Sequence, residues 1–231
     1  MRKRSRYASI DIHWVRDTGT AVLSAEYARY GPKQRIETCI SSWDPSDDQF
    51  SEGQWLGGRV EICDVSPNGR YMAYIGTAFH RPVPSYFAIS RPPCLTALVF
   101  EPIVYTSPCD AFFEDDRNYR LLFERPATSA NQSYEKEGGN LLRAPWLPEG
   151  NPQADDLSQP SSEEAAAAYP AAVSYMQYPA TTYWDPNDRL IVVFGFQIYA
   201  FSEEAPNGKL LIDLSDREFK KVPPPDWALQ W

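Results

Sequence analysis

Two clusters of acidic side chains beside aromatic rings are the residues whose types and spacing could do chemistry in this chain. One lies in the stretch WDPSDD, residues 43–48, and the other in FFEDD, residues 112–116. Glycoside hydrolysis needs a pair of carboxyl groups, and sugar rings stack on exposed aromatic faces. Acidic clusters of this kind are more often solvated turns. We therefore predict no catalytic residue and retain nine candidate binding residues: Trp43, Asp44, Asp47, Asp48, Phe112, Phe113, Glu114, Asp115 and Asp116.

Other site chemistries lack their motifs. Residues 44–48 and 185–188 do not alternate oxygen ligands around a bend glycine before a final glutamate, so neither is a calcium loop. The chain has no G-x-S-x-G elbow for a serine nucleophile. The glycine pairs at 57–58 and 138–139 lack the Lys-Ser/Thr of a phosphate-binding loop. We expect no cofactor.

The four cysteines, Cys39, Cys63, Cys94 and Cys109, form no C-x-x-C pair, and the chain has only two histidines. A zinc site needs closely spaced ligands, so no metal is expected. The basic start of the chain, residues 1–6, is not followed by the apolar stretch of a secretory signal. These features favour free, mostly buried thiols and a cytoplasmic location.

Charge restricts the classes of partner. The formal net charge is −9 at pH 7, which argues against nucleic acid and against an anionic membrane surface. No apolar run approaches the roughly 18 residues that a membrane-spanning helix needs. Complementary charge speeds encounter between proteins, so the composition allows a protein partner with basic groups. Ordinary solubility explains the acidity equally well.

The clearest sequence signal for secondary structure is at residues 64–76, DVSPNGRYMAYIG. The Ser-Pro-Asn-Gly stretch, residues 66–69, predicts a type I turn, with proline presetting φ and glycine accepting a positive φ. Residues 70–75 then predict a strand. Pro-Asn turns recur at 186–189 and 206–209, each followed by an apolar run. With residues 197–201 between them, they predict an antiparallel meander.

The phrase DVSPNGRYMAY resembles a blade phrase of TolB-like and WD40-like β-propellers. This resemblance implies blades that are each a small meander and that pack around a channel, but the chain lacks a Gly-His…Trp-Asp signature and a regular period of about 40–50 residues. A wider likeness, over roughly residues 43–125, is to an uncharacterised bacterial family with no assigned activity. It rests on WLGGRVEICD, residues 55–64, and AISRPPCLTAL, residues 88–98.

The remaining chain divides into strands and one irregular stretch. Residues 9–15 and 21–27 predict a hairpin, and residues 34–41, 60–64, 86–90 and 95–100 predict further strands. Dense prolines predict that the strands on either side of residues 91–93 lie at sheet edges or end there. Residues 126–182 are predicted to form an irregular insertion or linker within a single all-β domain, 1–231. Inside it, Ser161 and Glu164 predict a capping box, with a short helix that Pro170 ends. The proline-rich tail, residues 223–231, carries two tryptophans and either packs back onto the domain or offers an aromatic peptide to a partner, and we expect the first.

We therefore predict an all-β fold of antiparallel meanders, a small or incomplete propeller, with a β-sandwich as the alternative. For function, the absence of catalytic motifs and the aromatic-rich loops favour a non-enzymatic protein-interaction module. An immunity-type protein or inhibitor is one form of that hypothesis. The alternative is a carbohydrate-binding or glycoside-hydrolase-like domain that uses the aromatic and carboxylate loops.

Overall fold

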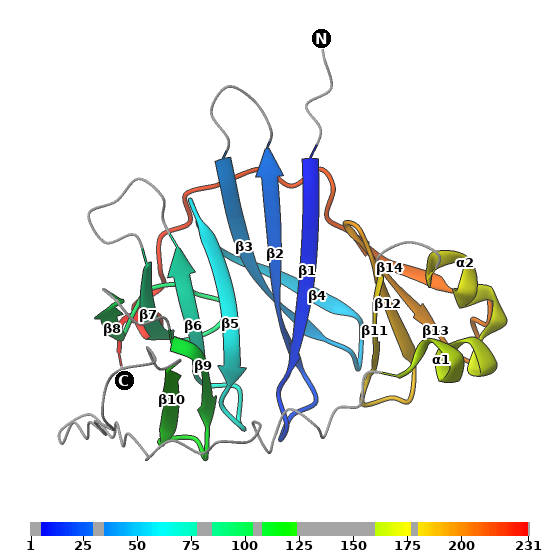
Figure 1. Ribbon diagram of the computed structural model, residues 1–231, viewed down its shortest axis with the longest axis horizontal. Helices are drawn as coiled ribbons and strands as arrows, with labels where there is room; N and C mark the ends of the chain where they lie inside the picture. Colours follow the sequence, from blue (N-terminus) through cyan, green and yellow to red (C-terminus); the bar gives the residue numbers. More distant parts are fainter. Residues whose placement is uncertain are drawn as a thin grey trace, which may run out of the picture.

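The computed structural model describes residues 6–29, 35–77, 85–103, 108–123, 160–176 and 180–230. Its strands form four antiparallel sheets, and neighbours in each sheet follow one another along the chain. None of these sheets closes into a barrel within the described residues. The prediction of an all-β fold built from meanders is confirmed, and the arrangement fits an incomplete propeller or a sandwich (Figure 1).

Three of the sheets are four-stranded meanders, and the fourth is a two-stranded ribbon. The first meander contains β1 (Arg6–Trp14), β2 (Ala21–Arg29), β3 (Arg35–Asp44) and β4 (Gln49–Leu56). The second contains β5 (Arg59–Val65), β6 (Met72–Thr77), β7 (Ser85–Ser90) and β8 (Val99–Pro102). The ribbon pairs β9 (Pro108–Phe113) with β10 (Tyr119–Phe123). The third meander contains β11 (Ala180–Trp184), β12 (Leu190–Phe194), β13 (Gln197–Phe201) and β14 (Lys209–Asp213).

The meanders pack in an order that differs from their order in the chain. Ile12 and Trp14 of β1 share a buried cluster with Ile191 and Val193 of β12, so the third meander lies beside the first. Residues on the other face of the first meander, such as Val22, pack with β5 and β6. The second meander in turn packs against the ribbon. The spatial order is therefore third, first, second, ribbon (Figure 1).

The first meander lies between the third and second meanders, which explains why buried and exposed residues do not alternate regularly along its strands. A sheet covered on one face alternates buried and exposed residues, whereas a sheet covered on both faces is apolar throughout. In β2 every residue from Ala21 to Ala28 is buried. Ala21 and Leu23 face the third meander, while Val22 faces the second. The small side chains in this strand let both neighbours approach closely.

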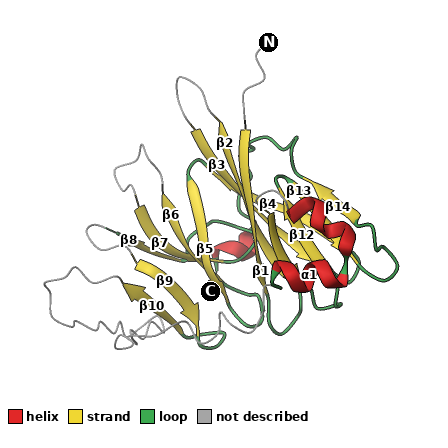
Figure 2. Cartoon of the chain, turned by 45° about the vertical axis from the view of Figure 1, so that its right-hand side comes forward, coloured by secondary structure: helices red, strands yellow, loops and turns green. Residues whose placement is uncertain are grey.

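Short helices cover the third meander. Ser161 caps α1 (Ser162–Ala168), and its hydroxyl and the Glu164 carboxylate form both hydrogen bonds of a capping box, as predicted. The helix ends before η1 (Pro170–Ala172), and α2 (Val173–Met176) follows. Ala165 and Ala172 pack on Leu190, Val192 and Phe201. The helices lie against the third meander (Figure 2). Of the predicted insertion, 126–182, residues up to 159 lie outside the described residues, and the later part contains these helices and the start of β11.

Local turn signals are confirmed, whereas one strand is displaced. Gly69 donates its N–H to the Ser66 carbonyl at 2.8 Å and has φ +74°, as the predicted turn requires. The predicted strand at 95–100 is wrong for its first four residues, because β8 begins at Val99. The Leu95 N–H is instead bonded to the Gln54 side chain at 2.7 Å. The edge position predicted from the prolines is confirmed for β8 but wrong for β7, which pairs with β6 on one side and with β8 on the other.

The last described residues, 214–230, form a segment that we call the C-terminal strap. It leaves β14, crosses the first meander and ends beside the second meander in η2 (Asp226–Leu229) (Figure 1). The Tyr27 hydroxyl donates to the Leu214 carbonyl at 3.1 Å, and Arg217 donates to the Ser41 hydroxyl at 2.9 Å. The expectation that the tail packs back onto the domain is confirmed for the backbone of the strap.

Candidate functional site

Trp43, the first candidate aromatic residue, belongs to the core. It is 1% exposed and lies between Trp14 and Phe50, with ring centroids 5.3 Å from each. The Phe50 ring is nearly parallel to the Trp43 ring, at an interplanar angle of 6°. Trp43 is therefore buried against neighbouring rings and offers no exposed face to a ligand.

Asp44 and Asp47 form the β3–β4 turn. Asp44 accepts hydrogen bonds from the Ser46 N–H at 3.0 Å and the Ser46 hydroxyl at 2.7 Å. These bonds lower the pKa of Asp44 below its ordinary value. Asp47 accepts from the Gln49 N–H at 3.1 Å. Carboxylates that bond to the backbone two residues on are typical turn residues, and both act in this way.

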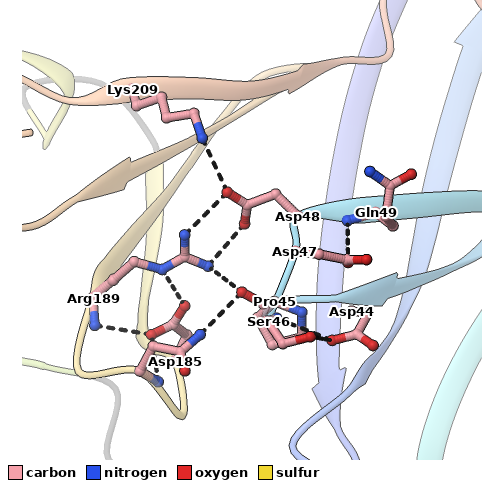
Figure 3. A network of polar contacts seen from close by, with 10 residues as sticks. Asp44, Pro45, Ser46, Asp47, Asp48, Gln49, Asp185, Arg189 and Lys209 are labelled. Carbon is pink, nitrogen blue, oxygen red and sulfur yellow. Dashed lines mark hydrogen bonds and ion pairs between the residues drawn. The ribbon is translucent and has the colours of Figure 1, made fainter.

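Asp48 has a different role, because it joins the first and third meanders (Figure 3). Its two oxygens accept from the Arg189 guanidinium at 2.9 and 3.1 Å, and Lys209 approaches at 3.2 Å. Arg189 also donates to Asp185 at 2.7 Å. Burial alone would raise the pKa of Asp48, but hydrogen bonds from Arg189 and Lys209 lower it below the ordinary value. We call Asp48, Asp185, Arg189 and Lys209 the charge network.

Two turns of similar sequence meet in the charge network. Trp43-Asp44-Pro45 precedes one turn, and Trp184-Asp185-Pro186 precedes the other. The Asn187 side chain donates to the Pro45 carbonyl at 3.0 Å, and Arg189 donates to the same oxygen at 3.1 Å. Asp185 accepts from the Asn187 and Arg189 N–H groups at 2.9 and 2.8 Å. Sequence reasoning missed this pairing, although the shared Trp-Asp-Pro phrase was a signal for it.

The second candidate cluster lies on the ribbon. Phe112 and Phe113 are buried, at 6% and 2% exposed, and Phe113 packs in the cluster between the ribbon and the second meander. Glu114 forms an ion pair with Arg120. Asp115 accepts from the N–H groups of Arg117 and Asn118, both at 2.7 Å. As in the first cluster, the rings build the core and the acids shape a turn.

Asp116 connects the ribbon to a row of turns along one end of the molecule. It accepts from the Asn68 N–H at 2.9 Å. The next residue back, Pro67, accepts from the Asp17 N–H at 2.9 Å. Gly19 of that β1–β2 turn lies so close to Pro186 that a Cβ built on it would be 3.1 Å from Cγ of the proline.

The contact of the Pro186 turn with Pro45 and Asp48 completes the row (Figure 1). The structure therefore places the two candidate clusters at opposite ends of a continuous row of turns. Each of the six candidate acids bonds to the backbone or to a side chain of the chain itself. Of these acids, Asp48 and Asp116 connect neighbouring sheets, and the other four bond within their own hairpin.

The described cysteine, histidine and acidic residues give little support for a metal site or a reactive thiol. Among the residues that the structure describes, no group of three or more His, Cys, Asp or Glu side chains is placed to hold a metal ion. Cys39 and Cys94 are buried free thiols, and Cys63 is partly exposed. Burial raises the pKa of the Cys39 thiol to about 11, which keeps it in the unreactive protonated form at neutral pH. The described helices include none with the length and apolar character to cross a membrane.

Among the described residues, four of the seven exposed large apolar side chains lie on the C-terminal strap, part of which the sequence leaves open as an aromatic peptide for a partner. Trp227 is 48% exposed and Leu229 is 54% exposed, while Phe219 and Val222 are 43% and 37% exposed. The backbone at the same place is fixed. Gln54 donates to the Val222 carbonyl at 3.0 Å, and Arg91 donates to the Trp227 carbonyl at 2.8 Å.

Comparison with known proteins gives no relative: no family model, no curated protein and no solved structure matches this chain.

Proposed function

We propose that this chain is a non-enzymatic protein-interaction module that binds a protein partner through the C-terminal strap. One observation carries the proposal: four large apolar side chains, Phe219, Val222, Trp227 and Leu229, are exposed on a backbone that hydrogen bonds hold in place. Scattered exposed apolar residues need no explanation. Four within eleven residues of one anchored segment suggest a binding surface.

The chemistry of these side chains suits a protein interface. Aromatic residues are enriched in interface cores, and tryptophan is the residue type most often found to dominate binding energy. Anchoring matters as well, because a segment that is already ordered loses less conformational entropy when it binds. Gln54, which is buried, holds the strap to β4 and to the connection after β7 at the same time.

Charge supports a partner whose rim is basic. The chain carries a formal net charge of −9, and Asp47, Asp115 and Asp188 are exposed on the row of turns. Such charges raise association rates and orient a basic partner more than they raise affinity. An inhibitor or immunity-type protein, which blocks its target by shape and charge, is one form that this activity would take.

The carbohydrate hypothesis has less support. It relied on Trp43, Phe112 and Phe113 to stack against sugar rings, and all three are buried. Its carboxylates, such as Asp44 and Asp115, accept hydrogen bonds within their own turns. The residues proposed for sugar binding are thus used by the fold.

The test is co-purification from a lysate of the source organism with three tagged proteins: the wild-type chain, Trp227→Ala/Leu229→Ala and the matched control Leu210→Ala. Leu210 is 45% exposed but lies on β14, outside the strap. We expect one stoichiometric protein with the wild-type chain and with the control, and its loss with the double variant. Equal recovery with all three proteins, or with none, would overturn the proposal.

A further inference from the structure

Three consecutive prolines, residues 223–225, lie between the two places where hydrogen bonds anchor the C-terminal strap. The Val222 carbonyl, immediately before them, accepts from Gln54 at 3.0 Å. The Trp227 carbonyl, two residues after them, accepts from Arg91 at 2.8 Å. Gln54 belongs to β4 of the first meander, and Arg91 follows β7 of the second. The prolines therefore span the junction between two sheets as a bridge fixed at both ends.

The bridge has the conformation of a polyproline II helix. Pro225 has φ −70° and ψ 156°, close to the ideal values of that helix. The rings of Pro223 and Pro224 fix their own φ angles, and a following proline restricts the residue before it to extended or polyproline II backbone. This helix has three residues per turn. Val222 and Pro225 consequently lie on the same edge, and both are exposed.

Proteins read such segments with grooves lined by aromatic side chains, because a preformed polyproline II helix loses little entropy on binding. Resting on the proposed function, we propose that the partner carries an aromatic-lined polyproline-binding groove, and that Val222 and Pro225 enter it. Pro224, which is only partly exposed, faces the protein. Exposed Lys221, one residue before Val222, would meet acidic side chains at the end of the groove.

Recognition by strand addition fits this segment less well. Strand addition uses a row of backbone N–H donors, and three consecutive prolines supply none. The residues from Leu214 to Pro225 also form no strand. The feature that remains available to a partner is the side-chain edge of Val222 and Pro225, because the carbonyl groups of these two residues already accept hydrogen bonds from Gln54 and Ala228.

The test uses isolated SH3, WW and EVH1 domains as probes, each labelled with ¹⁵N and titrated with the full chain while their NMR spectra are recorded. We expect the groove resonances of one domain class to shift with the wild-type chain and with the control Pro206→Ala, an exposed turn proline outside the strap. Val222→Ala/Pro225→Ala should weaken this binding at least tenfold. No shift with any class at about 1 mM chain, a concentration that detects even weak binding, would overturn the inference.

A second measurement separates this inference from the proposed function. The protein that co-purifies through Trp227 and Leu229 is titrated with the wild-type chain and with Val222→Ala/Pro225→Ala. A tenfold or greater loss of affinity supports a polyproline groove. Unchanged affinity overturns the inference and leaves the proposed function standing, whereas failure of the co-purification itself overturns the proposed function.

Discussion

The charge network buries charged side chains, whereas the C-terminal strap exposes large apolar side chains, and both arrangements are unusual in a folded protein. In the charge network, the Asp185 side chain is fully buried and Arg189 is 17% exposed, yet each has hydrogen-bonding partners. On the strap, Trp227 and Leu229 are about half exposed, although their backbone is anchored. Burying a charge is costly unless it is paired. Exposing large apolar side chains on an ordered backbone has no comparable structural benefit, so we assign structure to the first region and binding to the second.

The largest effect is expected from removing the cation of the charge network. Arg189→Ala would leave the buried Asp185 carboxylate without a cation, because Lys209 contacts Asp48 instead. Removing one partner of a buried ion pair lowers the free energy of unfolding by about 3–5 kcal/mol. Urea unfolding would measure this loss. Lys209→Ala is the control, since Lys209 is 63% exposed and such pairs contribute at most about 1 kcal/mol. Equal losses for the two variants would contradict the comparison.

Acid should destabilise the chain through His13 on β1, whose side chain is only partly exposed. Burial lowers the pKa of His13 to about 4, whereas an unfolded chain has a value near 6.5. The unfolded state therefore binds a proton that the folded state excludes, and the stability from neutral His13 is complete only above about pH 6.5. The free energy of unfolding should fall by about 3 kcal/mol as the pH drops to about 4. His13→Gln should flatten this part of the pH profile, and parallel profiles would contradict it.

A smaller effect is expected where β4 holds the strap. A Cβ on Gly53 would lie 2.1 Å from the Pro93 carbonyl oxygen, next to the bond from the Gln54 N–H to that oxygen. Gly53→Ala must push the two segments apart, and overpacking of this kind costs about 1–3 kcal/mol. Gly57→Ala is the matched control, because no atom lies within 4 Å of its Cβ position. Chemical denaturation of both variants would measure this difference in the free energy of unfolding. Equal stability of the two variants would contradict the close contact between Gly53 and Pro93.

The smallest effect on stability is expected from the strap side chains. Trp227→Ala/Leu229→Ala should change the free energy of unfolding by less than about 1 kcal/mol, because exposed residues contribute little to folding. Thermal and urea unfolding beside the wild-type chain would measure it. A loss as large as that expected for Arg189→Ala would mean that the strap serves the fold, and the contrast between the two regions would be lost.

The features predicted correctly are those that neighbouring residues determine. The Ser66–Gly69 turn, the Ser161–Glu164 capping box and the β12–β14 meander follow from residues within a few positions of each other. Turn chemistry, helix capping and alternation act over such distances. The all-β fold follows from their repetition along the chain.

The candidate site was less predictable, because its residues act through distant contacts. Asp48 and Arg189 are 141 positions apart, so nothing beside Asp48 indicates its cation. Trp43 and Phe113 look like surface residues beside acids, but strand direction turns both rings into the core. In the tail, composition indicated that Trp227 would pack, whereas only its backbone is anchored. Side-chain exposure depends on the whole fold, and sequence patterns do not contain it.

The most direct test of binding through the strap is site-specific photo-crosslinking in the source organism. A photoreactive phenylalanine analogue would replace Trp227 in one protein and Leu210 in another, since both positions are about equally exposed. The account predicts one dominant crosslinked protein from position 227 and none in common from position 210. The same products from both positions, or none from position 227, would contradict it.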